Sequence, residues 1–207
     1  MFHAYAITSY VFSLRGTEGL LIDLATLNRF WDTGKDNRQP YVVIPLRGKL
    51  KGESNHFCHL IPCVPITSSE IRVEASLYRL KELKQTLGFV DGPAISSIQG
   101  RVLTTRSLDG SFLDILEELF ETSRQMFPAH IKSEEDLRMK YQGFRSFRRT
   151  SDTQAIQMKI DQTDIDVVNR WKTVEKAKGS RPSRPMRQHY ADFSLLIDPF
   201  LRYTWAM

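Results

Sequence analysis

Residues 143–155 of this chain read GFRSFRRTSDTQA, which sets three arginines within five positions. Most of the stretch lies in a helix that we predict over Ser146–Met158. On a helix Arg145, Arg148 and Arg149 share one face, because spacings of three and four residues each complete about one turn. Three guanidinium groups on one face repel one another unless an anion lies between them. A phosphodiester fits, because guanidinium binds its oxygens with paired hydrogen bonds. The alternative is three solvated arginines on a charged face.

Basic residues are concentrated in the part of the chain around this stretch. The whole chain of 207 residues has a net charge of +5. Between Arg138 and Arg187 there are 13 Lys and Arg against 5 Asp and Glu, whereas residues 1–137 hold 15 basic and 17 acidic residues. A basic segment on a nearly neutral body is typical of a surface that contacts phosphates. Charge alone leaves open a solvated face or a disordered basic loop.

The hydrophobic pattern predicts an α+β protein that is mostly helical and forms a single domain over residues 1–207. A small antiparallel hairpin is expected near residues 41–66: Tyr41–Leu46 is rich in β-branched residues, Gly48–Gly52 forms the turn, and His56–Ile66 returns. The segments predicted as helices are Ala6–Phe30, Val73–Leu87, Ser111–Met126, Glu134–Tyr141, Ser146–Met158, Asp164–Trp171 and Met186–Leu201, the last of them helical up to Pro199.

Two further places in the sequence carry candidate functional side chains. Arg15 and Glu18 stand three residues apart among leucines. On a helix surface such a pair stabilises the helix by about 0.2–0.5 kcal/mol, whereas a mostly buried arginine needs a carboxylate or some other partner. Tyr190 lies in the stretch predicted to be helical near the C-terminus, where a tyrosine is usually a core or boundary residue. Taken alone, each motif leaves the purely structural interpretation open.

In chain order these motifs resemble those of the tyrosine recombinase (phage integrase) family. The family's first signature is an arginine with a glutamate three residues on, followed by an apolar helix, and Arg15 with Glu18 match it. Its next element is a lysine in a hairpin turn between two short strands. Lys49 in the GKLKG turn matches this lysine, with Lys51 as the alternative.

The family's later motifs follow in the same order. Its central box begins His-x-x-Arg, and Arg145 and Arg148 match it with an arginine in place of the usual histidine. A histidine or tryptophan comes next, where this chain has Trp171, and the nucleophilic tyrosine comes last, where it has Tyr190. The interval between these two is longer than usual, by about the length of the Lys176–Pro185 loop. The resemblance covers nearly the whole chain, and the family's separate N-terminal core-binding domain is expected to be absent.

The resemblance implies an enzyme that cleaves and rejoins DNA strands, in recombination or integration. Tyr190 would attack the scissile phosphate, forming a 3′-phosphotyrosyl intermediate and releasing a 5′-hydroxyl. Arg15 and Arg148 would hold the non-bridging oxygens, where negative charge develops in the transition state. Trp171 would donate an indole hydrogen bond to the same oxygens, and Lys49 would protonate the departing oxygen as general acid.

The resemblance also assigns supporting roles to other polar residues. Glu18 would orient Arg15, and Arg145 would either assist the phenolate or contact a phosphate. Basic side chains along the motifs and the loop would contact the DNA backbone. They are Lys51, Arg149, Arg170, Lys176, Lys178, Arg181, Arg184 and Arg187. For the Lys176–Pro185 loop, a flexible solvated insertion is the alternative.

The implied partner is double-stranded DNA, on which recombinases of this type work as homotetramers. No cofactor is expected, because the phosphotyrosyl link conserves the bond energy. Two alternatives stay open: a catalytically inactive DNA-binding remnant of a mobile element, and a type IB topoisomerase-like enzyme. Arg145 at the usual histidine position favours the inactive remnant. The run Ser180–Tyr190 resembles mobile elements of eukaryotic microbes, so the expected location is intracellular and, in a eukaryote, nuclear.

Other classes of protein are disfavoured by what the sequence lacks. The two cysteines, Cys58 and Cys63, do not make a disulfide framework, and with His56 and His59 they are too crowded for a tetrahedral zinc site. No apolar run approaches the roughly 18–20 residues that span a bilayer, so no membrane partner is expected. The N-terminus does not have the pattern of a signal peptide.

Overall fold

The computed structural model describes residues 1–27, 41–48, 57–141, 143–169 and 193–207. Within these ranges the chain is mostly helical with one two-stranded antiparallel sheet, which confirms the predicted α+β class. The elements in chain order are α1 Phe2–Val11, α2 Gly16–Gly19, α3 Leu24–Leu27, β1 Val42–Gly48, β2 Phe57–Cys63, α4 Val73–Thr86, α5 Thr105–Thr122, the 3₁₀ helix η1 Arg124–Met126, α6 Glu134–Lys140, α7 Arg145–Gln157, α8 Gln162–Asn169 and α9 Phe193–Trp205.

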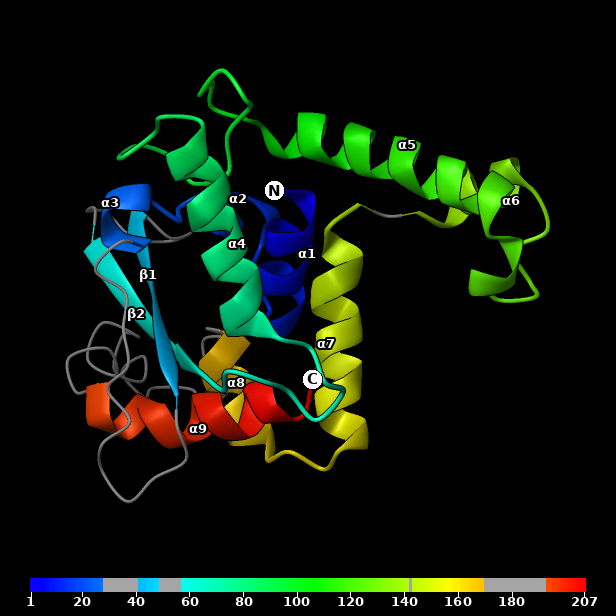
Figure 1. The fold of residues 1–207 in the computed structure, drawn as a ribbon. Helices are drawn as coiled ribbons and strands as arrows, with labels where there is room; N and C mark the ends of the chain where they lie inside the picture. Colours follow the sequence, from blue (N-terminus) through cyan, green and yellow to red (C-terminus); the bar gives the residue numbers. More distant parts are fainter. Residues whose placement is uncertain (28–40, 49–56, 142, 170–192) are drawn as a thin grey trace, which may run out of the picture.

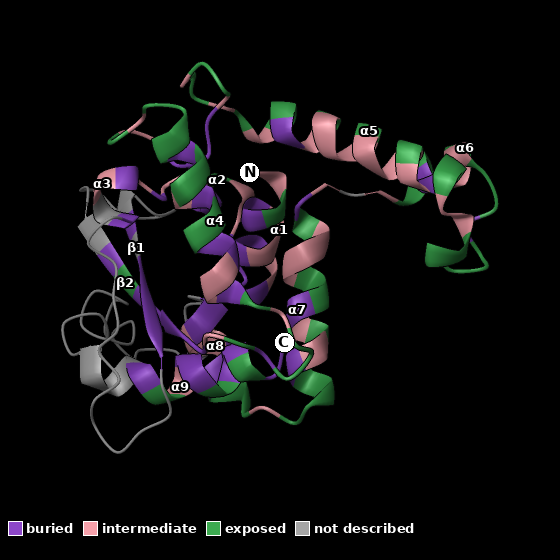
Figure 2. Ribbon diagram, in the orientation of Figure 1, coloured by how far each residue is buried: buried purple, intermediate pink, exposed green. Residues whose placement is uncertain are grey.

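The N-terminal helix α1 lies at the centre of the arrangement. It packs against α4 on one side and α7 on the other, while α9 packs against α8 and β2 (Figure 1). The largest core cluster joins residues of α1, both strands, α4, α7, α8 and α9. Figure 2 shows the same distribution, with buried residues gathered around α1 and the strands. No helix in the described ranges is long and apolar enough to cross a membrane.

The predicted single helix over Ala6–Phe30 is wrong. Helix α1 ends at Val11, and the short helices α2 and α3 follow it. The break has a backbone cause: Ser13 has a φ of 49°, and Arg15 is extended with a ψ of 151°. Neither conformation belongs to a right-handed helix. Leu14, Leu24 and Leu27 of this segment are buried nonetheless. The spacing of these apolar residues indicates that they are buried, but it does not indicate one continuous helix.

The predicted hairpin is confirmed as a pair of antiparallel strands. Val42 lies opposite Cys63 at one end of β1 and β2, and Gly48 lies opposite Phe57 at the other. Ile44, Leu46 and Ile61 are buried in the main core, so one face of this small sheet is covered. Most of the predicted turn, residues 49–52, lies outside the described residues.

Helix α5 begins six residues before the predicted start at Ser111 and ends at Thr122 rather than Met126. Its N-terminus is set by a capping box. The Thr104 hydroxyl accepts the Ser107 backbone N–H at 3.1 Å, and the Ser107 hydroxyl accepts the Thr104 N–H at 3.1 Å. The helix extends away from α1, with η1 and α6 at its far end (Figure 1). A small separate core of Phe120, Ile131 and Leu137 forms there.

Helix α9 passes through Pro199, so the predicted end of the C-terminal helix at this proline is wrong. A proline inside a helix removes one backbone hydrogen bond and disfavours continuation. Packing outweighs that cost here, because Phe200, Tyr203 and Thr204 beyond it are fully buried. The Thr204 hydroxyl also accepts the backbone N–H of Val64 at 3.2 Å, which ties the helix to the end of β2.

Tyr5 joins α1 to the two segments that carry the arginine motifs. Its buried ring meets Phe144 edge to face at a centroid distance of 4.5 Å, and its hydroxyl donates a hydrogen bond to the Gly16 carbonyl at 2.5 Å. Gly19 approaches the same ring so closely that a Cβ atom there would lie 2.7 Å from Tyr5 Cε2. The ring is held on several sides and has little room to move.

We therefore expect Gly19→Ala to destabilise the fold by about 1–3 kcal/mol through overpacking against Tyr5. Gly110→Ala is the matched control: it lies inside α5 with nothing within 4 Å of the added Cβ, and should stabilise by about 0.5–1 kcal/mol. Urea unfolding of both variants measures the difference. Equal stabilities of the two variants would contradict the close packing of Gly19 on Tyr5.

Candidate active site

Arg15 is held by Glu18 in the turn that follows α1. The Glu18 carboxylate accepts the Arg15 backbone N–H at 2.9 Å through Oε2 and the guanidinium at 2.9 Å through Oε1. The glutamate side chain is 2% exposed, whereas that of the arginine is 32% exposed. A buried carboxylate thus orients a guanidinium that still reaches solvent. This geometry suits a cation that must stay accessible to an external anion.

Helix α7 starts at a tightly constrained point. Gly143 has a φ of 67°, and a Cβ atom there would lie 2.8 Å from Asp109 Oδ1. The same carboxylate oxygen of Asp109 accepts the backbone N–H of Phe144 at 2.9 Å. Phe144 is buried and contacts the rings of Tyr5, Phe112 and Phe147. The direction of α7, and with it the direction of its arginines, is therefore fixed at the N-terminal end.

The three arginines of α7 differ in their surroundings. Arg145 and Arg149 are exposed, whereas Arg148 is half-buried. The guanidinium of Arg148 donates a hydrogen bond through Nη2 to the backbone carbonyl of Asn169 at 2.7 Å. Asn169 is the last residue of α8, and its carbonyl accepts Arg148 at a helix C-terminus, where the backbone dipole favours a cation. The position of Arg148 is thus tied to a second segment of the chain.

A buried polar network connects the Arg148 helix to the segment before Arg15. The Ser13 hydroxyl donates to Asn169 Oδ1 at 2.5 Å, and Asn169 Nδ2 donates to Asp152 Oδ1 at 2.6 Å. The Tyr203 hydroxyl donates to the same Asp152 oxygen at 2.8 Å and lies 2.7 Å from Ser151 Oγ. Ser13 and Asn169 are fully buried, and 156 residues of sequence separate them. The network joins the end of α1 to α7, α8 and α9.

The remaining predicted site residues lie outside the described residues. They are the two hairpin lysines, the tryptophan, the nucleophilic tyrosine and the basic residues around them: Lys49, Lys51, Arg170, Trp171, Lys176, Lys178, Arg181, Arg184, Arg187 and Tyr190. Among the predicted residues that are described, Arg15 is joined to Glu18, and Arg148 is joined to Asn169. Arg145 and Arg149 lie at the exposed surface of α7. The roles assigned to all of these residues stay predictions.

Four residues of the network were missed from the sequence: Ser13, Asp152, Asn169 and Tyr203. Asp152 lies in residues 143–155, one helical turn after Arg148. A polar residue on the inner face of an amphipathic helix could have indicated a hydrogen-bonded position in the core. Asn169 directly precedes the Arg170–Trp171 pair. Ser13 and Tyr203 carried no signal, because their partners are distant in sequence.

The histidines and cysteines of the hairpin were considered above as possible metal ligands. No group of three or more His, Cys, Asp or Glu side chains that could hold a metal occurs in the described ranges. His59 and Cys63 are both buried in β2. Burial raises the pKa of the Cys63 thiol well above its ordinary value, so this cysteine stays protonated and is a poor nucleophile near neutral pH.

Burial raises the pKa of the Tyr203 hydroxyl above its ordinary value of 10.0, and the nearby Asp152 charge raises it further. The folded protein therefore keeps Tyr203 neutral at a pH where the unfolded chain ionises it. This group's contribution to stability is complete below about pH 10 and is lost as the pH rises above that value.

We expect Tyr203→Phe to lower the free energy of unfolding by about 1–2 kcal/mol at pH 8, because Asp152 loses a donor. The deficit should shrink between pH 10 and 11, since the wild-type stability then falls more steeply, by up to about 1.4 kcal/mol per pH unit for one tyrosine. Urea unfolding at several pH values tests this. Thr153→Ala, an exposed neighbour on α7, should keep the wild-type slope. A Tyr203→Phe slope equal to that of the wild type would contradict the assignment.

Known proteins offer no independent guide to this site. Comparison of the chain with protein-family models, with curated proteins and with solved structures finds no match.

Proposed function

We propose that this chain cleaves and rejoins DNA strands through a 3′-phosphotyrosyl intermediate on Tyr190, in the manner of the tyrosine recombinases that its motifs resemble. One observation carries the proposal. The segments with Arg15 and Arg148 meet at the same residue, Asn169, through hydrogen bonds of 2.5 Å from Ser13 and 2.7 Å from Arg148. Two motif arginines that are far apart in sequence thus belong to neighbouring segments, as a shared phosphate ligand would require.

The two arginines have complementary settings for binding a phosphate. Arg15 is partly exposed and oriented by a buried carboxylate, and Arg148 is half-buried with its direction set by a backbone carbonyl. Cations held in advance at the place where negative charge develops stabilise a transition state without reorganising. A scissile phosphate gains negative charge on its non-bridging oxygens as the fifth bond forms. The geometry of the two arginines therefore favours a role in phosphoryl transfer over a role in simple electrostatic attraction to DNA.

The proposed reaction balances without a cofactor. Tyr190 reacts as the phenolate, its proton passing to solvent; its oxygen bonds to phosphorus, the bond from phosphorus to the 5′-oxygen breaks, and Lys49 or Lys51 supplies the proton that leaves with the 5′-hydroxyl. In the reverse direction a 5′-hydroxyl attacks the phosphotyrosine and releases Tyr190. The same arginines serve both steps, because both pass through the same kind of five-coordinate phosphorus.

The first test is a suicide-substrate trap. The full chain is incubated with duplexes of varied sequence that carry a 5′-bridging phosphorothiolate, whose thiol leaving group does not reverse the cleavage. A covalent protein–DNA band on a denaturing gel is expected with the wild type. Tyr190→Phe should abolish it, and Arg148→Ala should reduce its rate of formation by roughly 100- to 1000-fold, as for loss of one preorganised donor.

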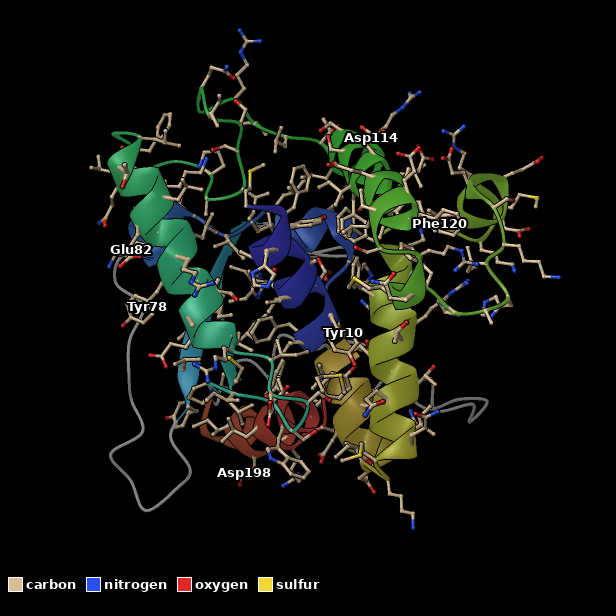
Figure 3. All side chains as sticks on the ribbon, turned by 45° about the vertical axis from the view of Figure 1, so that its right-hand side comes forward. Tyr10, Tyr78, Glu82, Asp114, Phe120 and Asp198 are labelled. Carbon is tan, nitrogen blue, oxygen red and sulfur yellow. The ribbon has the colours of Figure 1, made fainter. Side chains whose placement is uncertain are left out.

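Matched controls come from exposed residues of α4, away from the arginine segments. Tyr78→Phe and Arg79→Ala should form the adduct at the wild-type rate; Figure 3 shows Tyr78 on α4. Retention of the band in Tyr190→Phe would contradict the assigned nucleophile. No band with any duplex, together with intact DNA binding by fluorescence anisotropy, would favour the catalytically inactive DNA-binding alternative.

A further inference from the structure

The hydrogen bonds around Asn169 connect the segments of both motif arginines, in addition to filling the core. The side-chain oxygen of Asn169 accepts from Ser13, its amide donates to Asp152, and its backbone carbonyl accepts from Arg148. One residue therefore makes hydrogen bonds both to the segment that leads into Arg15 and to Arg148 itself. Its burial is complete, so water does not compete for these bonds.

Asp152 completes the connection on the other side. Its Oδ1 atom accepts from Asn169 and from Tyr203 of α9, and lies 3.3 Å from the Ser13 hydroxyl. Asp152 follows Arg148 by one turn of α7, so the same rigid helix carries both. Asp152 is half-buried, and its carboxylate joins the helices through directional hydrogen bonds that apolar side chains would not supply.

We propose that Asp152 and Asn169 are positioning residues, which set the separation and direction of Arg15 and Arg148 for one phosphate. This inference rests on the proposed function. Asn169 fixes Arg148 through its carbonyl, and the Ser13 hydroxyl anchors the turn two residues before Arg15. Asp152 accepts the side-chain amide of Asn169 and so holds its side-chain oxygen toward Ser13. Neither positioning residue touches the DNA.

The same network connects the arginines to the C-terminal helix. Tyr203 of α9 donates to Asp152, and α9 is the helix that follows the segment with Tyr190 in sequence. Asn169 directly precedes Arg170 and Trp171 in the chain. A shift of α9 would therefore alter the hydrogen bonds of Asp152 and, through Asn169, the direction of Arg148. Asp152 thus couples the placement of the arginines to the packing of α9.

The test compares two scissile groups that differ in their need for arginine. A phosphodiester carries a negative charge that grows in the transition state, whereas a methylphosphonate, with methyl in place of one non-bridging oxygen, starts neutral. A variant whose only defect is misplaced arginines should be slow on the phosphodiester and recover on the methylphosphonate. A variant that is simply less folded should be slow on both.

We expect Asp152→Ala, which removes the accepting oxygen, to form the covalent adduct roughly 10- to 100-fold more slowly than the wild type on the phosphodiester, the scale of a small misplacement of reacting groups. On the methylphosphonate, this variant should form the adduct at nearly the wild-type rate. Arg148→Ala should do the same. Ser13→Gly is a second variant, and it should keep the fold because glycine adopts the φ of 49° found at this position without strain. It removes the contacts of the Ser13 hydroxyl with Asn169 and Asp152 and should show the same pattern.

Asp114→Ala is the matched control, an exposed carboxylate on α5 (Figure 3) that should behave as the wild type on both substrates. Wild-type rates for Asp152→Ala on the phosphodiester overturn the inference and leave the proposed function standing. Equal losses on both substrates, with a matching fall in the urea unfolding midpoint, also overturn it. Absence of any wild-type adduct overturns the proposed function and this inference together.

Discussion

The hydrogen bonds of Asp152 and Asn169 join four parts of the chain that are distant in sequence. They connect the turn after α1, the middle of α7, the end of α8 and the inner face of α9. Tyr203 and Asn169 are fully buried, so both depend on these partners rather than on water. Hydrophobic contact alone would let these helices slide, whereas a directional network selects one arrangement. The orientation of the arginine segments depends on that selection.

Charge is distributed over the described helices in a way that fits this arrangement. The arginine segments lie on the body of the protein, where α1 and α7 pack together. Helices α5 and α6 extend from it and carry many acidic residues, such as Asp114, Glu117 and Glu134. Acidic helices repel phosphate groups, so the proposed contact with DNA would lie on the arginine side of the molecule. The exposed Arg145 and Arg149 would extend that side along α7.

Local patterns predicted α4 and α7 closely but missed both ends of α5 and the turn after α1. The spacing of Leu77 and Leu80 predicted α4 to within one residue at its C-terminal end, and the basic stretch predicted α7 equally closely. The supposed helix over Ala6–Phe30 failed because the backbone at Ser13 is left-handed, a state that its hydroxyl bond to Asn169 supports. The end expected at Pro199 failed because buried residues beyond the proline hold the helix together.

The sequence by itself determined the fold class, the hairpin strands, most helices and the motif residues, because periodicity and residue chemistry are local properties. It also paired Arg15 with Glu18, since three residues on a chain suffice for that contact. Only the tertiary structure decided that Ser13, Asp152, Asn169 and Tyr203 form one network. Their hydrogen bonds cross up to 156 residues, and such partners are chosen by the packing of whole helices rather than by neighbouring side chains.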